Sequence, residues 1–450
     1  MVLVGVLVAA LLDGTVAAST KALTDGVAGI ATGFTDLPTL LTRELIPSDG
    51  YYRPGVGWME TFPQNIGLGA GLAPAHAWAV RVLAVYTYAF VLLAWVWKGY
   101  TLFRDRYRYA DWTPRDDVVR RLRGHYWGQF GMIVVIAFIV FALFAPTLGP
   151  TTVEDNIYNP YGNTFEYYDD GAGEVVEITH GTANRDTISQ GDNANVGPLS
   201  YDQYGRWHPF GTLTSGKDLF TFMAAGARVS LFIAILALLI AGGVGATMAL
   251  VTAYYKGLLD LGTVVASDSV QSIPGLVALI LLSEVFSGHP LANVYNGGFL
   301  LALFIGLISW PAYWRAIRGP AFQVAEKEWI DAAKSFGQRP TTTMRKHIAP
   351  YVVGYLLIYA SLAIGGVIIS VAALSFLGLG VNPPTPEWGR AVNAGRPYIS
   401  TASWHIATIP GVMVVIVVTG FNALGDGIRD AIDPQSDTGE SGAAATAGGG

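Results

Sequence analysis

Long uncharged apolar blocks dominate the hydrophobic pattern of this chain. Four blocks lack Asp, Glu, Lys and Arg over enough residues to cross about 30 Å of hydrocarbon, which takes roughly 20 helical residues. Two further apolar runs carry charges only near their ends. Each block is apolar on all sides, as expected for helices covered by lipid or by other helices. The pattern predicts six core spans: Trp127 to Val153, Val229 to Tyr255, Ser269 to Ser283 extended back towards Leu261, Phe299 to Trp314, Ile348 to Pro386, and Ile406 to Gly425.

Two apolar segments precede these core spans. Val82 to Trp97 predicts a further span, because Arg81 can snorkel at one end and aromatic residues form an interfacial belt at the other. Val2 to Leu12 reaches Asp13 after 11 residues and fits a span, a half-inserted segment or a cleaved leader. We therefore expect residues 1–126 to form an N-terminal extension with one or two additional membrane spans.

The distribution of Lys and Arg near the helix ends predicts the orientation of the chain. Residues 98–128 hold eight basic residues against four Asp, and residues 315–350 hold seven basic residues against three acidic ones, so both segments should lie inside. Residues 150–215 hold ten acidic residues against Arg185 and Arg206, which predicts an acidic external loop. Residues 435–450 are mostly Gly, Ala and Ser and should form a disordered tail.

Composition supports a multi-pass protein of the cell membrane. The chain is 52% hydrophobic and only 13% charged, whereas a soluble domain carries about 25% charge. A net charge of -6 argues against bulk binding of nucleic acid. Cysteine is absent, which excludes disulfides and thiolate sites. The low number of Lys (7, beside 20 Arg) and the acidic outer loop fit either a salt-adapted surface or any acidic exported loop.

The segment from Glu326 to Pro350 predicts a helix-turn-helix beneath the membrane. Gly337 can end the first helix in a left-handed cap, and Pro340 can begin the second, which then gives way to the next span at Pro350. Such an exposed helix could lie in a groove of a partner, although a plain surface loop is the alternative. The apolar positions at helical spacing in the first helix are Trp329, Ile330, Ala333 and Phe336.

Several stretches carry a resemblance to one family. Asp331-Ala-Ala-x-x-x-Gly337, followed by Ile348-Ala-Pro350, resembles the signature loop of ABC importer permeases, with Asp331 in place of Glu and Ala349 in place of Leu. Leu374 to Arg390 and Asn422 to Pro434 look like the C-terminal half of the dipeptide, oligopeptide and nickel branch of that family. Further matches in family order are His208-Pro-Phe-Gly-Thr, Gly216-Lys-Asp218, Gly226-Ala-Arg-Val-Ser230 and Asp268-Ser-Val-Gln-Ser-Ile-Pro274.

The resemblance implies an all-α polytopic membrane protein with a six-span type I ABC importer permease core over residues 127–434. It implies a heterodimer with a sister permease, two cytoplasmic ATP-binding subunits and an extracytoplasmic solute-binding protein. The chain would not be an enzyme; it would form the path for a peptide or, as the second choice, nickel. The residues implied in coupling to the ATPases are Asp331, Ala332, Ala333, Gly337, Ile348 and Pro350, and those that would face the binding protein are Pro383, Pro384, Trp388 and Arg390.

Other chemistry is weakly supported. Gly211 to Asp218 nearly matches a phosphate-binding P-loop, but its last position is Asp where magnesium needs Ser or Thr, so ATP would be hydrolysed by a separate subunit. The seven histidines have no metal-ligand spacing, and we expect no cofactor. Two rival functions stay open on the residues alone. One is a membrane-anchored scaffold that works through its acidic outer loop, and the other is an ion-coupled secondary carrier or channel using Asp13, Asp260, Asp268 and Glu284.

Overall fold

The computed structural model describes residues 50–53, 57–60, 73–109, 114–169 and 171–432. In this part of the chain, six helices are long and apolar enough to cross a membrane: Pro74–Arg106, Tyr126–Leu143, Leu219–Tyr255, Pro290–Ala325, Pro340–Phe376 and His405–Ile432. They contain most of the predicted spans, including the N-terminal one at Val82 to Trp97, and confirm an all-α polytopic fold. The predicted segment Val2 to Leu12 and the tail 435–450 lie outside the described residues.

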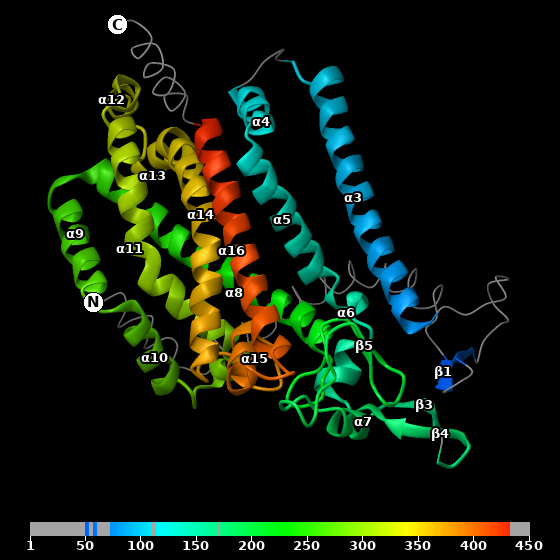
Figure 1. Ribbon diagram of the computed structural model, residues 1–450. Coiled ribbons are helices and arrows are strands. Elements are labelled where there is room, and N and C mark those ends of the chain that lie inside the picture. The colour runs from blue at the N-terminus through cyan, green and yellow to red at the C-terminus, as the bar shows by residue number, and fades with distance from the viewer. Residues whose placement is uncertain (1–49, 54–56, 61–72, 110–113, 170, 433–450) are drawn as a thin grey trace, which may run out of the picture.

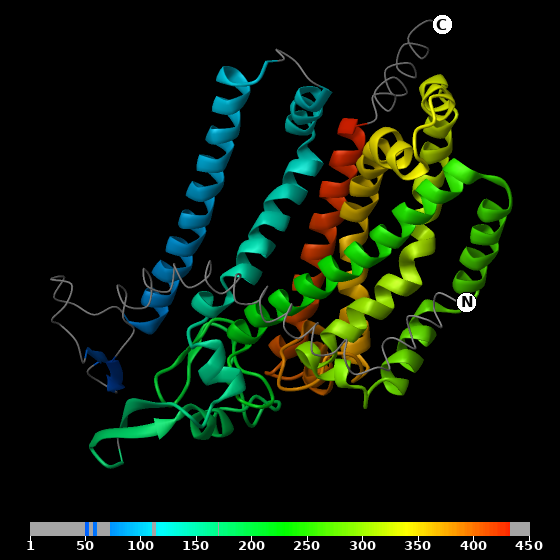
Figure 2. The same cartoon turned by 180° about the vertical axis from the view of Figure 1, so that it is seen from behind.

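The helices that are long enough to cross a membrane form the bundle, and most of them run alongside one another (Figure 1). Helix α8 crosses the bundle obliquely (Figure 2), packing most extensively against α11, while α16 packs against α5 and α14. Shorter helical pieces lead into two of them: η2 (Pro290–Gly297) precedes α11, and α13 (Pro340–Thr343) with the π-turn η3 (Met344–Ile348) precedes α14. The helices are α3 (Pro74–Arg106), α5 (Tyr126–Leu143), α8 (Leu219–Tyr255), α11 (Gly298–Ala325), α14 (Ala349–Phe376) and α16 (His405–Ile432).

The predicted span from Leu261 to Ser283 is not one straight helix, so this prediction is wrong in its geometry. The chain forms α9 (Gly257–Gln271) and α10 (Gly275–Val285), which are bent by 79° relative to each other. Pro274 between them is extended, with φ -56° and ψ 117°. Proline has no N–H to continue a helix and disfavours helical geometry in the residue before it. The chain enters α9 at one end of the bundle and leaves α10 at the other (Figure 1), so the two helices form one broken span.

The ends of the bundle differ in the way that the charges predict. At one end, here called the inner end, lie α4 (Pro114–Gly124), α12 (Glu328–Ser335) and α13 (Figure 1). At the opposite, outer end lie the elements of the acidic loop together with α15 (Trp388–Gly395) and η4 (Arg396–Tyr398). The basic segments and the acidic segment thus lie at opposite ends, as strict alternation of the spans requires.

The acidic outer loop is an ordered layer of short elements. Its hairpin of β3 (Thr164–Asp169) and β4 (Glu174–Thr179) is antiparallel, with Thr164 opposite Thr179 and Asp169 opposite Glu174. A second antiparallel pair of the loop joins β5 (Ser200–Tyr201) to β6 (Trp207–His208). A further pair, β1 (Gly50–Arg53) with β2 (Gly57–Glu60), comes from the N-terminal part of the chain and not from this loop. The short helices of this layer are α6 (Ala145–Leu148), η1 (Glu154–Tyr158) and α7 (His180–Asp186).

Two hydrophobic cores hold the bundle together. The larger one joins α5, the first half of α8, α11, α14 and α15 towards the outer end. The smaller one, here called the inner core, joins the last turns of α8 and α11 to the start of α14. The inner core also includes one residue of α12, and this connects the short inner helix to the membrane-spanning helices.

Candidate functional site

Helix α12 is a short helix with well-defined ends. Glu328 and Asp331 lie in its first turn and Lys334 in its last, which complements the helix dipole. Gly337 adopts the predicted left-handed conformation, with φ +72°. Its N–H donates to the Lys334 carbonyl at 2.9 Å, and the next N–H donates to the Ala333 carbonyl at 3.1 Å. These two bonds form a Schellman cap, so the predicted end of the helix at Gly337 is confirmed.

Ile330 fixes α12 to the rest of the molecule. Its side chain is fully buried in the inner core. The core partners come from three membrane helices, including Ala253 of α8, Ile317 of α11 and Val352 of α14. Lys334 adds a cation–π contact, with its ammonium nitrogen 5.1 Å from the centroid of the Tyr254 ring on α8. A displacement of α12 would therefore act directly on the inner ends of α8, α11 and α14.

The opposite side of α12 presents apolar rings to solvent. Phe336 is 91% exposed and Trp329 is 47% exposed. Asp331 and Ala332 are also exposed, while Ala333 is half-buried. The four apolar residues with helical spacing therefore do not share one buried face, because only Ile330 points into the core. Exposed aromatic rings beside small residues are typical of a surface that a partner covers.

The second predicted helix begins where the sequence places it, at Pro340 in the first turn of α13. It does not yield at Pro350, because α13, η3 and α14 follow one another without a break. Pro350 lies just after the π-turn η3, so the helical bond that its missing N–H removes falls at this irregular point of the continuous helix. Ile348 is fully buried in the inner core and Pro350 is exposed.

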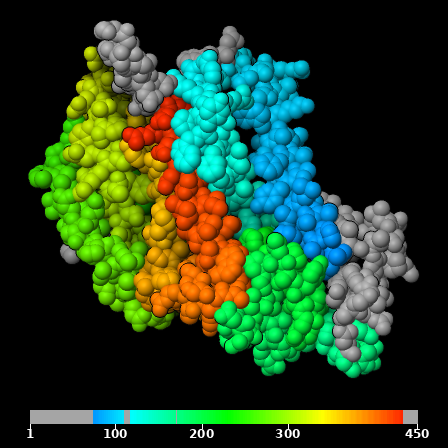
Figure 3. Space-filling view, viewed as in Figure 1, coloured from blue at the N-terminus to red at the C-terminus, as the bar shows by residue number. Residues whose placement is uncertain are grey.

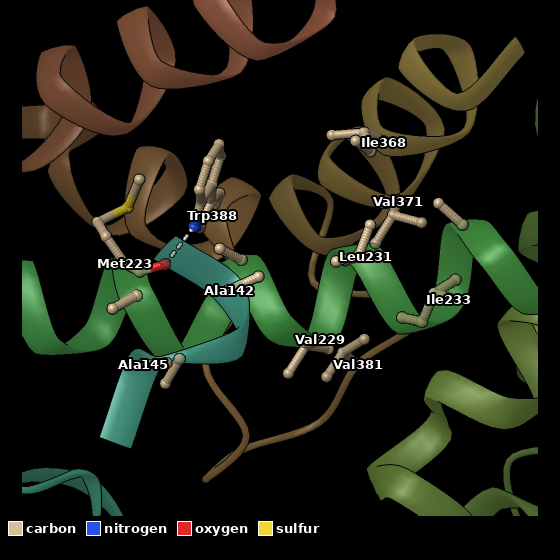
Figure 4. Close-up of a cluster of buried hydrophobic side chains, with 14 of the residues drawn as sticks. Ala142, Ala145, Met223, Val229, Leu231, Ile233, Ile368, Val371, Val381 and Trp388 are labelled. Carbon is tan, nitrogen blue, oxygen red and sulfur yellow. Dashed lines mark hydrogen bonds between the residues drawn. The ribbon is translucent and has the colours of Figure 1, made fainter. Parts of the chain in front are cut away.

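The residues predicted to face a binding protein lie in the external segment after α14, and they differ in how exposed they are. Pro383 and Pro384 are exposed. Trp388 is only 1% exposed, so the prediction that its ring lies on an outer docking surface is wrong for this structure. Its indole Nε1 donates to the Met223 carbonyl of α8 at 2.7 Å, as Figure 4 shows, and its ring meets Phe138 of α5 edge-on with 5.7 Å between ring centroids.

Glu387 and Arg390 orient the start of α15. The Glu387 carboxylate accepts hydrogen bonds from the backbone N–H groups of Gly389 at 2.7 Å and Arg390 at 3.3 Å, which caps the helix. Burial raises the pKa of Glu387 to about 7, and these hydrogen bonds offset the rise only in part. The half-buried Arg390 side chain lies over Phe222, with its guanidinium carbon 5.8 Å from the ring centroid.

A buried charge cluster has no signature of its own in the sequence, although two of its residues fall in stretches with family resemblance. The His208 ring lies between two carboxylates, with Nδ1 2.9 Å from Asp218 and Nε2 3.2 Å from Asp202. Arg206 Nε donates to Asp202 at 2.7 Å. Burial alone would lower the pKa of His208, but the two carboxylates outweigh it and raise that pKa. The cluster joins the outer loop to the first turn of α8.

The P-loop-like stretch is part of the same cluster. Asp218 caps α8 by accepting from the Thr221 N–H at 2.7 Å, and its carboxylate is fully buried. The N-terminus of α8, where a phosphate would bind, therefore already carries a negative side chain of the chain itself.

The acidic residues considered for an ion path are engaged in different ways. Asp260 accepts from Arg318 Nε at 2.7 Å, and Asp268 pairs with Arg315. Glu284 lines a cavity of about 120 Å³ between α10, η2, α11 and the loop after α14. Asp13 lies outside the described residues.

Two segments of the chain match known protein families. Residues 241–437 match the family described as "Binding-protein-dependent transport system inner membrane component". Residues 113–164 match the family described as "N-terminal TM domain of oligopeptide transport permease C".

Individual relatives agree with these matches. The glutathione transport system permease protein GsiD of Escherichia coli O1:K1 / APEC is 32% identical over 323 residues, which cover 72% of this chain and 91% of that protein. The protein of the same name from Shigella dysenteriae serotype 1 (strain Sd197) is 31% identical over the same shares. A solved structure described as a crystal structure of an amino acid ABC transporter with histidines matches with a TM-score of 0.32 and 20% identity, covering 43% of this chain and 87% of that one.

Proposed function

The chain belongs to the family of binding-protein-dependent transport inner membrane components, as an ABC importer permease of the oligopeptide and dipeptide type, and from this premise we propose that it forms the path for a peptide. It is a multi-pass protein of the plasma membrane and a transport permease, not an enzyme. In this proposal it pairs with a sister permease, two cytoplasmic ATP-binding subunits and an extracytoplasmic solute-binding protein.

The observation that carries the coupling proposal is the burial of Ile330 opposite the exposed rings of α12. The exposed face, with Asp331, Ala332 and Phe336, would lie in a groove of an ATP-binding subunit. When the ATP-binding subunits close, they would displace α12, and Ile330 would carry that displacement into α8, α11 and α14. The subunit forms no covalent bond in this cycle; it shifts between inward-open and outward-open states, which its partners must bind with different affinities.

The proposed cargo is a short peptide. Its support is the match to a peptide permease family together with relatives whose names include glutathione transport, and glutathione is itself a tripeptide. On the outer side, the exposed Pro383 and Pro384 are the residues of the external segment that we place against the binding protein.

The test of the coupling proposal is the substitution Gly337→Val. A β-branched residue at φ +72° would strain the backbone by about 1–3 kcal/mol and disrupt the cap of α12. We expect transport and substrate-stimulated ATP hydrolysis to be lost while the protein still inserts in the membrane. Uptake of labelled peptide into vesicles with the assembled transporter measures the effect.

Gly354→Val on α14 is the matched control. A Cβ added at either glycine would meet no atom within 4 Å, but only Gly337 has a positive φ. The control should therefore retain transport. Normal uptake by the Gly337→Val protein would contradict the role of α12 in coupling.

A further inference from the structure

Helix α3 of the N-terminal extension packs against the bundle through its outer half. Its buried residues, Ala77, Arg81, Val85 and Ala89, recur along one face. Two hydrogen bonds fix this half: Trp78 Nε1 donates to the Leu148 carbonyl at 3.1 Å, and the Tyr86 hydroxyl donates to the Ala137 carbonyl of α5 at 3.2 Å. Figure 3 shows the blue surface of α3 at one edge of the molecule, beside α4 and α5 in cyan.

Beyond Ala89 the packing stops. Every residue from Phe90 to Tyr100 is exposed, on all sides of the helix, so the side turned towards α5 is exposed as well. Most of these residues are large and apolar, with Val91 61% and Val96 55% exposed. Helix α5 is also exposed at the same end of the bundle, at Trp127, Phe130 and Ile133.

Helix α3 meets the rest of the chain again at the inner end, through α4. The Arg123 guanidinium carbon lies 5.1 Å from the centroid of the Trp97 ring, and Arg108 forms an ion pair of 2.9 Å with Asp116. Ala89 and Trp97 are eight residues apart, about 12 Å along a helix. The stretch between them, here called the window, is bounded by the Tyr86 hydrogen bond on the outer side and by Arg123 on the inner side.

The inner rim of the window has an excess of positive charge. The described acidic residues of α3 and α4 are each paired with an arginine, in the pairs Arg104–Asp105, Arg108–Asp116 and Arg120–Asp117. In the inner half of α3 and in α4, four described cations form no ion pair with a described carboxylate: Lys98, Arg106, Arg121 and Arg123. Arg121 donates to the Ala431 carbonyl, and Arg123 lies on Trp97. Lys98 is the next residue after Trp97 on α3, so Lys98 and Arg123, two cations without a described carboxylate partner, lie at the same level of the helix as that ring.

We propose that the window between α3 and α5 binds one anionic phospholipid. An acyl chain would lie along Val91 to Val96, and the phosphate would lie at Arg123 and Lys98. Cations between membrane helices at their cytoplasmic ends are the arrangement that binds anionic lipid headgroups. Trp97 fits the headgroup level, where aromatic rings with a polar edge are favoured. The lipid would fill the space beside the inner half of α3 and connect the N-terminal extension to the permease bundle.

Native mass spectrometry of the purified full-length protein tests this site directly. The detergent-solubilised protein is mixed with phosphatidylglycerol or with phosphatidylcholine of the same acyl chains. We expect one tightly held phosphatidylglycerol and no equivalent phosphatidylcholine. Arg123→Gln should weaken binding of phosphatidylglycerol by about fivefold, the effect of one cation near a lipid surface, and Arg123→Gln with Lys98→Gln by about 25-fold.

Arg120→Gln is the matched control. It removes one positive charge from the same helix, but Arg120 is already paired with Asp117, so binding should stay within about twofold of the original protein. Equal retention of the two lipids, or equal loss in Arg120→Gln and Arg123→Gln, would overturn the proposal. So would cross-linking of residue 92 or 96 to another polypeptide in the assembled transporter, because the window would then hold a protein segment. The readout is lipid retention, so it is independent of whether the cargo is a peptide.

Discussion

Trp388 fills the space between α5 and α8 at the outer end of the bundle. The ring can approach α8 closely because residue 226 is glycine; a Cβ there would lie 2.8 Å from the Trp388 ring. Gly226 and Trp388 are 162 residues apart in the sequence, and both fall in stretches with family resemblance. Their contact gives one physical reason for this pair of residue types.

Trp388→Phe should destabilise the protein by about 0.5–1.5 kcal/mol, because the Met223 carbonyl would lose the indole donor and keep only its bond within α8. Trp388→Ala should cost about 3–5 kcal/mol through the cavity that it leaves. The thermal unfolding midpoint in detergent measures both. Pro383→Ala, at an exposed position, is the control and should leave the midpoint unchanged. If Trp388→Phe left the midpoint unaltered but weakened association of the binding protein, Trp388 would contact that protein instead of stabilising the bundle.

The His208 cluster predicts a pH optimum for the stability of the outer loop. The raised pKa of His208 means that its contribution is complete below its ordinary pKa of 6.5 and is lost as pH rises through the folded value. Burial would raise the pKa of Asp202, but Arg206 and His208 outweigh it and lower it to about 2, so its contribution is complete above 3.8 and is lost as pH falls towards 2. Both contributions are complete between about pH 4 and 6.5.

Hydrogen exchange of residues 187–218 across pH 3 to 9 measures this optimum. Protection should be highest between about pH 4 and 6.5 and should fall at lower and at higher pH. His208→Gln removes the positive charge between Asp202 and Asp218 and should cost about 3–5 kcal/mol, the usual effect of breaking a buried ion pair. Protection that is flat with pH, or unchanged in His208→Gln, would show that the histidine is neutral and merely hydrogen-bonded.

At the scale of elements, the apolar residues of α12 have two roles: Ile330 packs in the inner core, and the rings of Trp329 and Phe336 face outwards. Phe336→Ala should leave the unfolding midpoint unchanged, because its ring is 91% exposed, whereas Trp329→Ala should lower the midpoint slightly, because its ring is only 47% exposed. Under the proposed function each should weaken association with the ATP-binding subunits by about 2 kcal/mol, as expected for aromatic residues at the centre of an interface. Co-purification and titration of the ATP-binding subunits onto the permease measure this.

Ile330→Ala serves as the comparison. It should cost about 2–5 kcal/mol of stability through the inner core. Full ATPase association by the Phe336→Ala protein would mean that the exposed face of α12 is not where those subunits bind.

Local rules predicted some element boundaries but not all, because the end predicted at Pro350 does not occur. The cap at Gly337 and the start at Pro340 depend on backbone preferences of single residues, and both are confirmed. The bend at Pro274 had the same kind of signal, but the apolar pattern on both sides hid it. The burial of Trp388 had no local signal, because it depends on α5 and α8 coming together in three dimensions.

At the scale of the whole molecule, charge predicted the arrangement better than hydrophobicity predicted the path of each helix. The basic and acidic segments lie at opposite ends of the bundle (Figure 1). The run of apolar residues located the spans but could not give the oblique course of α8, the order within the outer loop or the separation of α3 from α5. These follow from packing between distant residues, which a sequence pattern does not encode.

Helix α8 links the two ends of the molecule in one unbroken piece. Its 37 residues extend over about 55 Å, from Asp218 in the buried charge cluster to the inner core around Ile330. A rod of that length, pivoting by about 5° at its midpoint, would swing each tip by roughly 2 to 3 Å in opposite directions. Such a rigid pivot needs no bend and no flexible joint: a displacement of the inner tip of α8 would move the outer tip in the opposite direction.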